Sequence, residues 1–168
     1  MATIDLATVN ALDDDAFVDA FGAVLEDSPH LAVAVGEQRP FADVDALAAA
    51  FATVIDGLAE PAALTLLCAH PELGAKRPMA AASVEEQASA GLPDAEAELQ
   101  ARLAAGNAAY RERFGFPFII AVRGRTPDEI VAVLEERLDN ERPEELATAL
   151  DQVATIARLR IDQIVDQP

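Results

Sequence analysis

Start signals for α-helices recur along the whole chain, and they constrain its fold more than any other feature. Ser28 and Thr126 each precede a proline, which is the pattern of a capping residue followed by the first helical position. The run LDDDAFVDAFGAVLED places acidic residues in a first turn, with an apolar stripe behind them. Helices are predicted on this basis over residues 12–27, 28–35, 43–58, 60–70, 83–91, 93–115, 126–140 and 143–165. The chain is therefore predicted to be all-α, a bundle of about eight helices in a single domain over residues 1–168.

The amino-acid composition supports helices over strands. Of the 168 residues, 52% are hydrophobic but only 5% are aromatic, because alanine and leucine dominate. The run EPAALTLLCAH is apolar nearly all round, which predicts a buried helix. One segment does not fit, since FPFIIAVRG, residues 116–124, is β-branched and flanked by glycines. A single strand would have no partner here, so we expect this segment to be a buried extended connector or a short helix.

A formal net charge of −18 argues against some classes of binding partner for this protein. So acidic a surface repels nucleic acid and anionic membranes, and it suits a soluble protein. The chain has no run of ~18 apolar residues that could span a membrane, and its N-terminus lacks the basic and apolar regions of a signal peptide. Cys68 is the only cysteine, so an internal disulfide is excluded and a reducing cytoplasm is the expected compartment.

His70 is one of two histidines, and it ends the most apolar of the predicted helices. An imidazole is favourable at the partly negative end of a helix, so a purely structural role is one interpretation. Pro71 then stops the helix and restricts the backbone, which is how a catalytic group can be held still. Both interpretations remain open at this level. Cys68, two residues earlier, has no visible activating base and is predicted to be inert.

Arg160 is the most unusual charge in the last predicted helix. At 100° per residue it lies about 20° from Val153, in the middle of an apolar stripe, whereas Arg158 lies about 140° away, towards solvent. A guanidinium on a core-facing stripe needs an anion, because an unpaired buried charge is costly. That anion is either an internal carboxylate or an anionic ligand gripped by the forked donors of arginine.

Two other polar positions have structural explanations. The sequence SVEE is a capping box in which Ser83 would cap a helix and Glu86 would reach back to it. Asn107 lies on the apolar stripe of its helix, where a buried asparagine that ties down a loop is expected. Two histidines and one cysteine are a poor ligand set for zinc, and no metal site is predicted. No nucleotide-binding or nucleophile motif is present either, so no cofactor is predicted.

Taken in order, several motifs resemble the 2-oxo-4-hydroxy-4-carboxy-5-ureidoimidazoline (OHCU) decarboxylases of urate degradation. Each motif is weak alone, but together they cover nearly the whole chain. The matching runs are RPF (39–41), HPELGAK (70–76), SVEEQASAGL (83–92), NAAYRERFGFPFIIAVRG (107–124), ERLDN (136–140) and IARLRIDQI (156–164). The family's usual HPDLAG is HPELGA here, which leaves His70 and Pro71 in place.

The resemblance implies an all-α carbon–carbon lyase, usually a homodimer, that converts OHCU to (S)-allantoin with loss of CO2 and without cofactor or metal. It implies that His70 acts as general acid or base, with Glu86 orienting it or sharing its proton, and that Arg160 holds an anionic group of the substrate. Lys76 would add to the local positive field. The remaining substrate-binding positions that it implies are Pro71, Ser83, Gln87, Phe118, Ile119, Ile120, Ala121 and Val122.

Two other functions remain possible from the sequence. A hydrolase of a related ureide would use the same Arg, His and Glu but would release no CO2. A non-enzymatic helical interaction module would bury Arg160 against an internal acid and would have no pocket beside His70.

Overall fold

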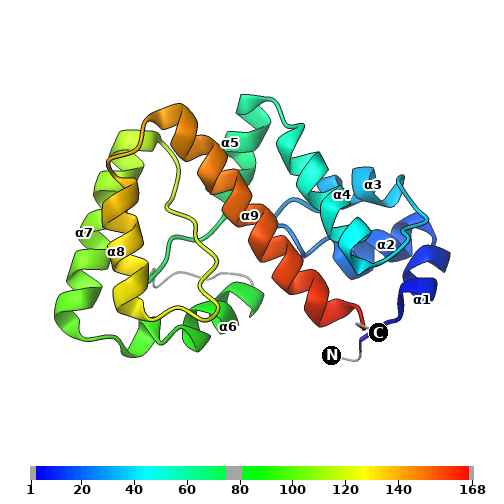
Figure 1. Cartoon of the computed structure of the whole chain (residues 1–168), viewed down its shortest axis with the longest axis horizontal. Coiled ribbons are helices and arrows are strands. Elements are labelled where there is room, and N and C mark those ends of the chain that lie inside the picture. The colour runs from blue at the N-terminus through cyan, green and yellow to red at the C-terminus, as the bar shows by residue number, and fades with distance from the viewer. Residues whose placement is uncertain (1–2, 75–80, 167–168) are drawn as a thin grey trace. The chain divides into compact units, whose positions relative to one another are not determined.

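The computed structural model describes residues 3–74 and 81–166 (Figure 1). Within these residues the regular structure is nine α-helices and one short 3₁₀-helix, with an isolated bridge between Ile4 and Val165 in place of any strand. The predicted all-α class is confirmed, with nine α-helices in the described ranges where about eight were expected. The contacts divide the chain into two compact units, and each unit is described by itself.

The first unit comprises Met1–Ala69 and Val153–Pro168. Stacked aromatic rings lie at its centre, with the ring centroids of Phe17 and Phe21 4.7 Å apart. A Cβ atom at Gly36 would lie 3.1 Å from Phe17, so glycine lets this helix pack closely against the ring. The unit contains α1 (Leu6–Ala11), α2 (Asp14–Phe21), α3 (Pro29–Gly36), α4 (Val44–Asp56), α5 (Glu60–Ala69) and the C-terminal part of α9 (Arg142–Ile164).

The helix predicted over residues 12–27 is shorter than expected. It begins where the Asp13 carboxylate accepts a hydrogen bond from the Ala16 N–H, and it ends at Phe21. Gly22 follows, and a Cβ atom there would lie 2.6 Å from the Val18 carbonyl oxygen and 3.2 Å from Pro29. The chain leaves the helix after Gly22, and Glu26 lies in the turn and not on a helix.

Helix α5 is also less buried than predicted. Its buried side chains are Ala63, Leu66 and Leu67, while Cys68 is exposed. An apolar composition dominated by small side chains thus does not require burial on every face. Among the described residues no single helix is long and apolar enough to cross a membrane, although α4 and α5, bent by 117°, pass that test as a pair.

The second unit is His70–Gln152. Helices α7 (Ala97–Phe114) and α8 (Pro127–Arg137) of this unit lie side by side in Figure 1, and a Cβ atom at Gly106 would lie 2.6 Å from the Leu134 side chain. Between these helices, residues 116–124 run without helix or strand, and Phe116 to Ile120 are buried. The prediction of a buried connector is confirmed. The elements are α6 (Ala81–Ser89), η1 (Leu92–Asp94), α7 (Ala97–Phe114), α8 (Pro127–Arg137) and the N-terminal part of α9.

Candidate active site

His70 follows the last residue of α5 and opens the second unit. Its side chain is buried, with 4% of its surface exposed, and Pro71 behind it is half-buried. The position at a helix end is as predicted. Burial of an ionisable side chain at the start of a loop is a feature of functional sites, but it also occurs in structural histidines.

The loop after His70 is fixed on two sides. The Gly74 N–H donates to Oε1 of Gln87 on α6 over 2.9 Å, and Nδ2 of Asn107 on α7 donates to the Leu73 carbonyl over 2.9 Å. Gly74 has a φ of 75°, a conformation that favours glycine. The prediction that Asn107 ties down a loop is confirmed. His70 is therefore followed by a backbone that two buried amide side chains hold in place.

Three predicted site residues share α6. Ser83, Glu86 and Gln87 are spaced i, i+3 and i+4, so their side chains project from the same side of the helix. Ser83 and Gln87 are buried and Glu86 is half-buried. The capping box predicted here is wrong, because α6 already includes Ala81 and Ala82. Alanine is the strongest helix former, and it places Ser83 inside the helix.

The five residues Phe118 to Val122 belong to the irregular segment between α7 and α8. All except the half-buried Ala121 are buried. The Ile119 carbonyl accepts from Nη1 of Arg137 over 2.8 Å, and the Ala121 N–H donates to Oε1 of Gln152 over 3.0 Å. Among the described residues none makes a hydrogen bond to the N–H or C=O of Ile120. Buried backbone groups of this kind require a partner, so they suit a polar ligand.

Arg160 belongs to the first unit, on the buried side of α9. It is 4% exposed, which confirms the prediction that it faces the core. Its Nη1 lies 3.2 Å from Oε2 of Glu26 and 3.3 Å from the Val24 carbonyl oxygen. The structure thus supplies the internal carboxylate that was one of the two predicted partners. Sequence reasoning missed Glu26 because it was expected on a helix.

Arg158 differs from the solvated charge that was predicted. Its side chain is 37% exposed and forms ion pairs with Asp45 at 2.5 Å and with Asp162 at 2.9 Å. Lys76, expected to add positive charge, lies outside the described residues. Within residues 3–74 and 81–166, no group of three or more His, Cys, Asp and Glu side chains is placed to hold a metal ion.

A cavity of about 500 Å³ lies within the second unit. Of the predicted site residues, Gln87 lines it, together with Asn107 and the loop residues Leu73 and Gly74. Oδ1 of Asn107 is buried and has no hydrogen-bond partner among the described residues. The amide side chains that fix the His70 loop therefore also form part of a cavity wall.

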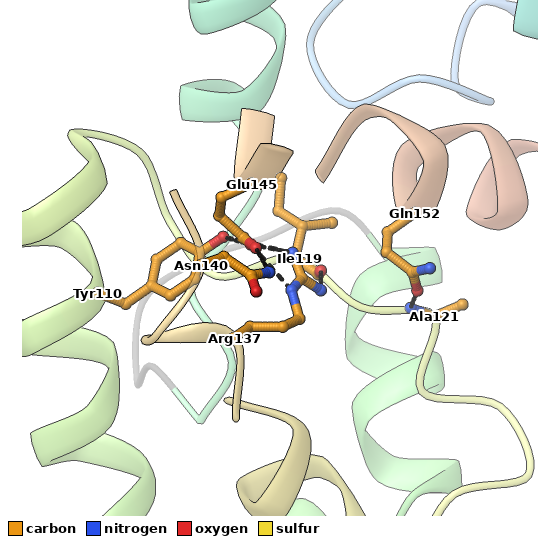
Figure 2. A network of polar contacts seen from close by, with 7 residues as sticks. All are labelled: Tyr110, Ile119, Ala121, Arg137, Asn140, Glu145 and Gln152. Carbon is orange, nitrogen blue, oxygen red and sulfur yellow. Dashed lines mark hydrogen bonds and ion pairs between the residues drawn. The ribbon is translucent and has the colours of Figure 1, made fainter. Parts of the chain in front are cut away.

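Two residues without a predicted role contact the irregular segment directly, namely Arg137 and Gln152 (Figure 2). Arg137 is in the ERLDN run, and Gln152 lies in the middle of α9. The motif does not reveal the contact of Arg137, and no motif includes Gln152, since both contacts join residues at least 18 positions apart.

The fold and these residues define an all-α protein with a buried histidine, a tethered loop and a buried irregular segment in one unit. The chain belongs to the OHCU decarboxylase family, whose model matches residues 10–162. The match spans both units and extends over all the predicted site residues.

Relatives of similar length carry the same name. A 2-oxo-4-hydroxy-4-carboxy-5-ureidoimidazoline decarboxylase of Haloferax volcanii is 45% identical over 161 residues, covering 96% of each chain. One from Halalkalicoccus jeotgali is 40% identical over 167 residues, covering 98% of this chain and 93% of the relative. Among solved structures, an (S)-allantoin synthase is similar with a TM-score of 0.81 and 26% identity. That similarity covers 97% of this chain but 54% of the synthase.

Proposed function

We propose that this protein decarboxylates OHCU to (S)-allantoin in urate degradation, as a carboxy-lyase that needs no cofactor. The observation that carries the proposal is the family match over residues 10–162, which includes His70, Glu86 and Arg160. The buried irregular segment supports it, because the backbone groups of Ile120 can read the N–H and C=O groups of a ureide.

The chemistry suits a site built from side chains alone. The C–C bond to the carboxylate breaks, CO2 leaves, and the electron pair moves into the neighbouring C=N bond of the ring. The substrate therefore provides its own electron sink, and a cofactor is not required for that purpose. The protein has to control charge during bond breakage and deliver a proton to one face of the product.

In this proposal His70 is the general acid or base at the hydroxyl-bearing carbon, and Glu86 orients it or shares its proton. Arg160 and the backbone of the irregular segment hold the carboxylate or a ring carbonyl. Pro71, Ser83 and Gln87 contact the substrate. The burial of His70 and the tether from Gln87 to Gly74 support these roles, because catalytic groups need a fixed geometry.

We further propose a homodimer that works in the cytoplasm. Family resemblance supports the dimer, and the single cysteine supports a reducing compartment. The net charge of −18 opposes an anionic substrate at long range. Screening over roughly 8 Å reduces that effect, so a nearby guanidinium can dominate at the site.

The direct test is to add the protein to freshly generated OHCU and to follow dextrorotatory allantoin by circular dichroism, with CO2 release measured in parallel. We expect both signals, unchanged by exhaustive EDTA treatment. A product that retains the carboxylate, with no CO2 released, would indicate a ureide hydrolase, and no turnover would indicate an interaction module. Loss of activity with EDTA and recovery with one divalent ion would exclude the cofactor-free reaction.

A substitution at His70 tests its role. His70→Asn should lower kcat by about 10²-fold or more, the usual scale of lost acid–base catalysis, with helical content preserved. Cys68→Ser, two residues away and exposed, is the control and should stay active. An active or an unfolded His70→Asn variant would return this histidine to a structural role.

A further inference from the structure

The irregular segment is buried but belongs to no helix or sheet, so it has no regular hydrogen bonds to fix its backbone. Two side chains supply that order instead. Arg137 binds the carbonyl of Ile119, and Gln152 binds the N–H of Ala121. These contacts lie immediately before and after Ile120, and Figure 2 shows both of them. The peptide groups on either side of Ile120 are thereby attached to α8 and α9.

Arg137 is itself held from several directions. Its Nε donates to Oε1 of Glu145 over 2.8 Å, and its Nη2 also contacts Glu145 and lies 3.3 Å from the Tyr110 hydroxyl. Glu145 additionally accepts hydrogen bonds from the Tyr110 hydroxyl and from Nδ2 of Asn140, the latter over 2.7 Å. We call these four residues the Arg137 cluster. With its carboxylate bound by three neighbours, the cluster fixes the direction in which Nη1 points.

The same cluster also contacts Phe118, the first residue of the predicted binding run 118–122. The Arg137 guanidinium lies 4.8 Å from the ring centroid of Phe118, and the Tyr110 ring meets the Phe118 ring edge-on at 5.4 Å. Phe118 is fully buried. One guanidinium therefore orders two neighbouring residues, Phe118 through its ring and Ile119 through its carbonyl.

A buried ion pair is a poor device for stability alone, because apolar side chains of similar volume often stabilise a core equally well. A pair that also donates a hydrogen bond to an irregular backbone has a second use. We propose that Arg137 and Gln152 are positioning residues that hold Ile120 between two anchored neighbours, so that its free N–H and C=O face the substrate. The inference rests on the proposed function, in which this segment binds the ureide.

Gln152 offers the cleaner test, since its side chain is half-buried and uncharged. Gln152→Leu removes the acceptor for the Ala121 N–H, whereas Gln152→Glu retains an oxygen at that place. We expect Gln152→Leu to lower kcat/KM by about 10-fold and Gln152→Glu to recover most of it. Gln163→Leu, on the same helix with an exposed side chain, is the matched control and should behave as wild type.

Arg137 is tested with a variant that keeps the fold. Arg137→Met combined with Glu145→Gln removes both charges and keeps one of the two acceptor oxygens that Tyr110 and Asn140 use. We expect a melting temperature within a few degrees of wild type and a loss in kcat/KM of about 10²-fold, the effect of a misplaced binding group. Full activity in a folded double variant would overturn the proposal, as would an activity loss that matches the unfolded fraction.

A readout without substrate separates this inference from the proposed function. Amide hydrogen exchange measured by NMR should be faster at Ala121 in Gln152→Leu than in wild type or Gln163→Leu. If wild type fails to turn over OHCU but this exchange difference is present, the proposed substrate is wrong and the anchoring holds. If wild type is active and neither exchange nor kcat/KM changes in Gln152→Leu, the positioning role is wrong.

Discussion

Each unit of this protein buries one arginine against one glutamate, and the two pairs are built differently. In the second unit, Arg137 and Glu145 belong to a cluster with Tyr110 and Asn140, and the arginine also reaches the Ile119 carbonyl. In the first unit, Nη1 of Arg160 lies 3.2 Å from Glu26 and 3.3 Å from the Val24 carbonyl. The contacts of Arg137 to Glu145 Oε1 and to Ile119 are both 2.8 Å.

The two glutamates also come from different surroundings. Glu145 is on α9 and has no exposed surface, whereas Glu26 lies in the turn that follows α2. A carboxylate saturated by three neighbours serves to fix a structure. Glu26 meets Arg160 from a turn and not from a helix. Arg137 therefore has a structural task within its cluster, and the substrate role of Arg160 stays a proposal.

The largest expected loss of unfolding free energy comes from replacing the glutamate of each buried ion pair. Glu145→Ala leaves Arg137 buried without its carboxylate and also removes the acceptor of Tyr110 and Asn140, so we expect a loss of about 3–5 kcal/mol in unfolding free energy. Glu26→Ala leaves Arg160 buried without this carboxylate but keeps the Val24 carbonyl as an acceptor, so we expect a smaller loss of about 1–3 kcal/mol. Urea unfolding at neutral pH measures both. Equal losses would show that the two pairs do the same structural work.

The second prediction compares the two arginines of α9 that are two positions apart. Arg160→Ala should remove a charge-assisted contact of about 1.5–3 kcal/mol, roughly 10- to 150-fold in kcat/KM. Arg160→Lys should restore only part, because an ammonium cannot present the guanidinium fork. Arg158→Ala breaks two partly exposed ion pairs and should cost no more than about 1 kcal/mol of stability, with normal activity.

Steady-state kinetics, with a melting curve for each variant, distinguishes a substrate-binding role of Arg160 from a purely structural one. If Arg160→Ala melts at a much lower temperature but binds and converts substrate normally, Arg160 is half of a structural pair with Glu26. Its assignment to the site would then have to be withdrawn, and the two buried pairs would be alike.

The sequence predicts best what depends on local periodicity. Helical spacing placed Arg160 on a buried face and Asn107 on a stripe where it ties a loop, and both are so in the structure. Helical spacing does not predict features that depend on residues far away in the sequence. Helix α2 ends at Phe21, earlier than the periodicity predicts, and Glu26 in the following turn lies within reach of Arg160. The Arg137 cluster could not be predicted because its members come from α7, α8, α9 and the residues between them.

The third prediction concerns Tyr110, whose hydroxyl joins the Arg137 cluster. Tyr110→Phe should cost about 1.5 kcal/mol at neutral pH, the scale of a hydrogen bond to a charged group. Burial, and then the hydrogen bond to Glu145, raise the pKa of Tyr110 above its usual value. The folded state thus keeps its proton when the unfolded state begins to lose it near pH 10.0.

This raised pKa determines the sign of the pH effect. The stability that Tyr110 contributes is complete below the unfolded pKa and is lost as the pH rises through the folded value. The difference between wild type and Tyr110→Phe should therefore narrow above about pH 10 in urea titrations. A difference that grows with alkaline pH would mean that the phenol ionises more readily in the cluster than in the unfolded chain.

The smallest predicted loss of stability concerns the first turns of two helices, one in each unit, that begin with a Ser–Pro or a Thr–Pro dipeptide. In the second unit the Thr126 N–H donates to Glu129 over 2.7 Å and the Glu129 N–H donates to the Thr126 hydroxyl over 3.3 Å, which completes a capping box. In the first unit Ser28 precedes Pro29, but its side chain makes no capping hydrogen bond. The same Ser/Thr–Pro signal therefore has two different structural outcomes.

Thr126→Ala should lower the unfolding free energy by about 1 kcal/mol, because it removes a side chain that satisfies a helix N–H. Ser28→Ala should cost about 0.5 kcal/mol or less, since no such bond is lost. Thermal melts of the two variants beside wild type measure the difference. Equal losses would show that Ser28 caps α3 in solution, and the contrast between the two units would then not extend to their helix starts. Because neither residue is among the proposed site residues, both variants should turn over substrate like wild type, which separates stability from catalysis in this chain.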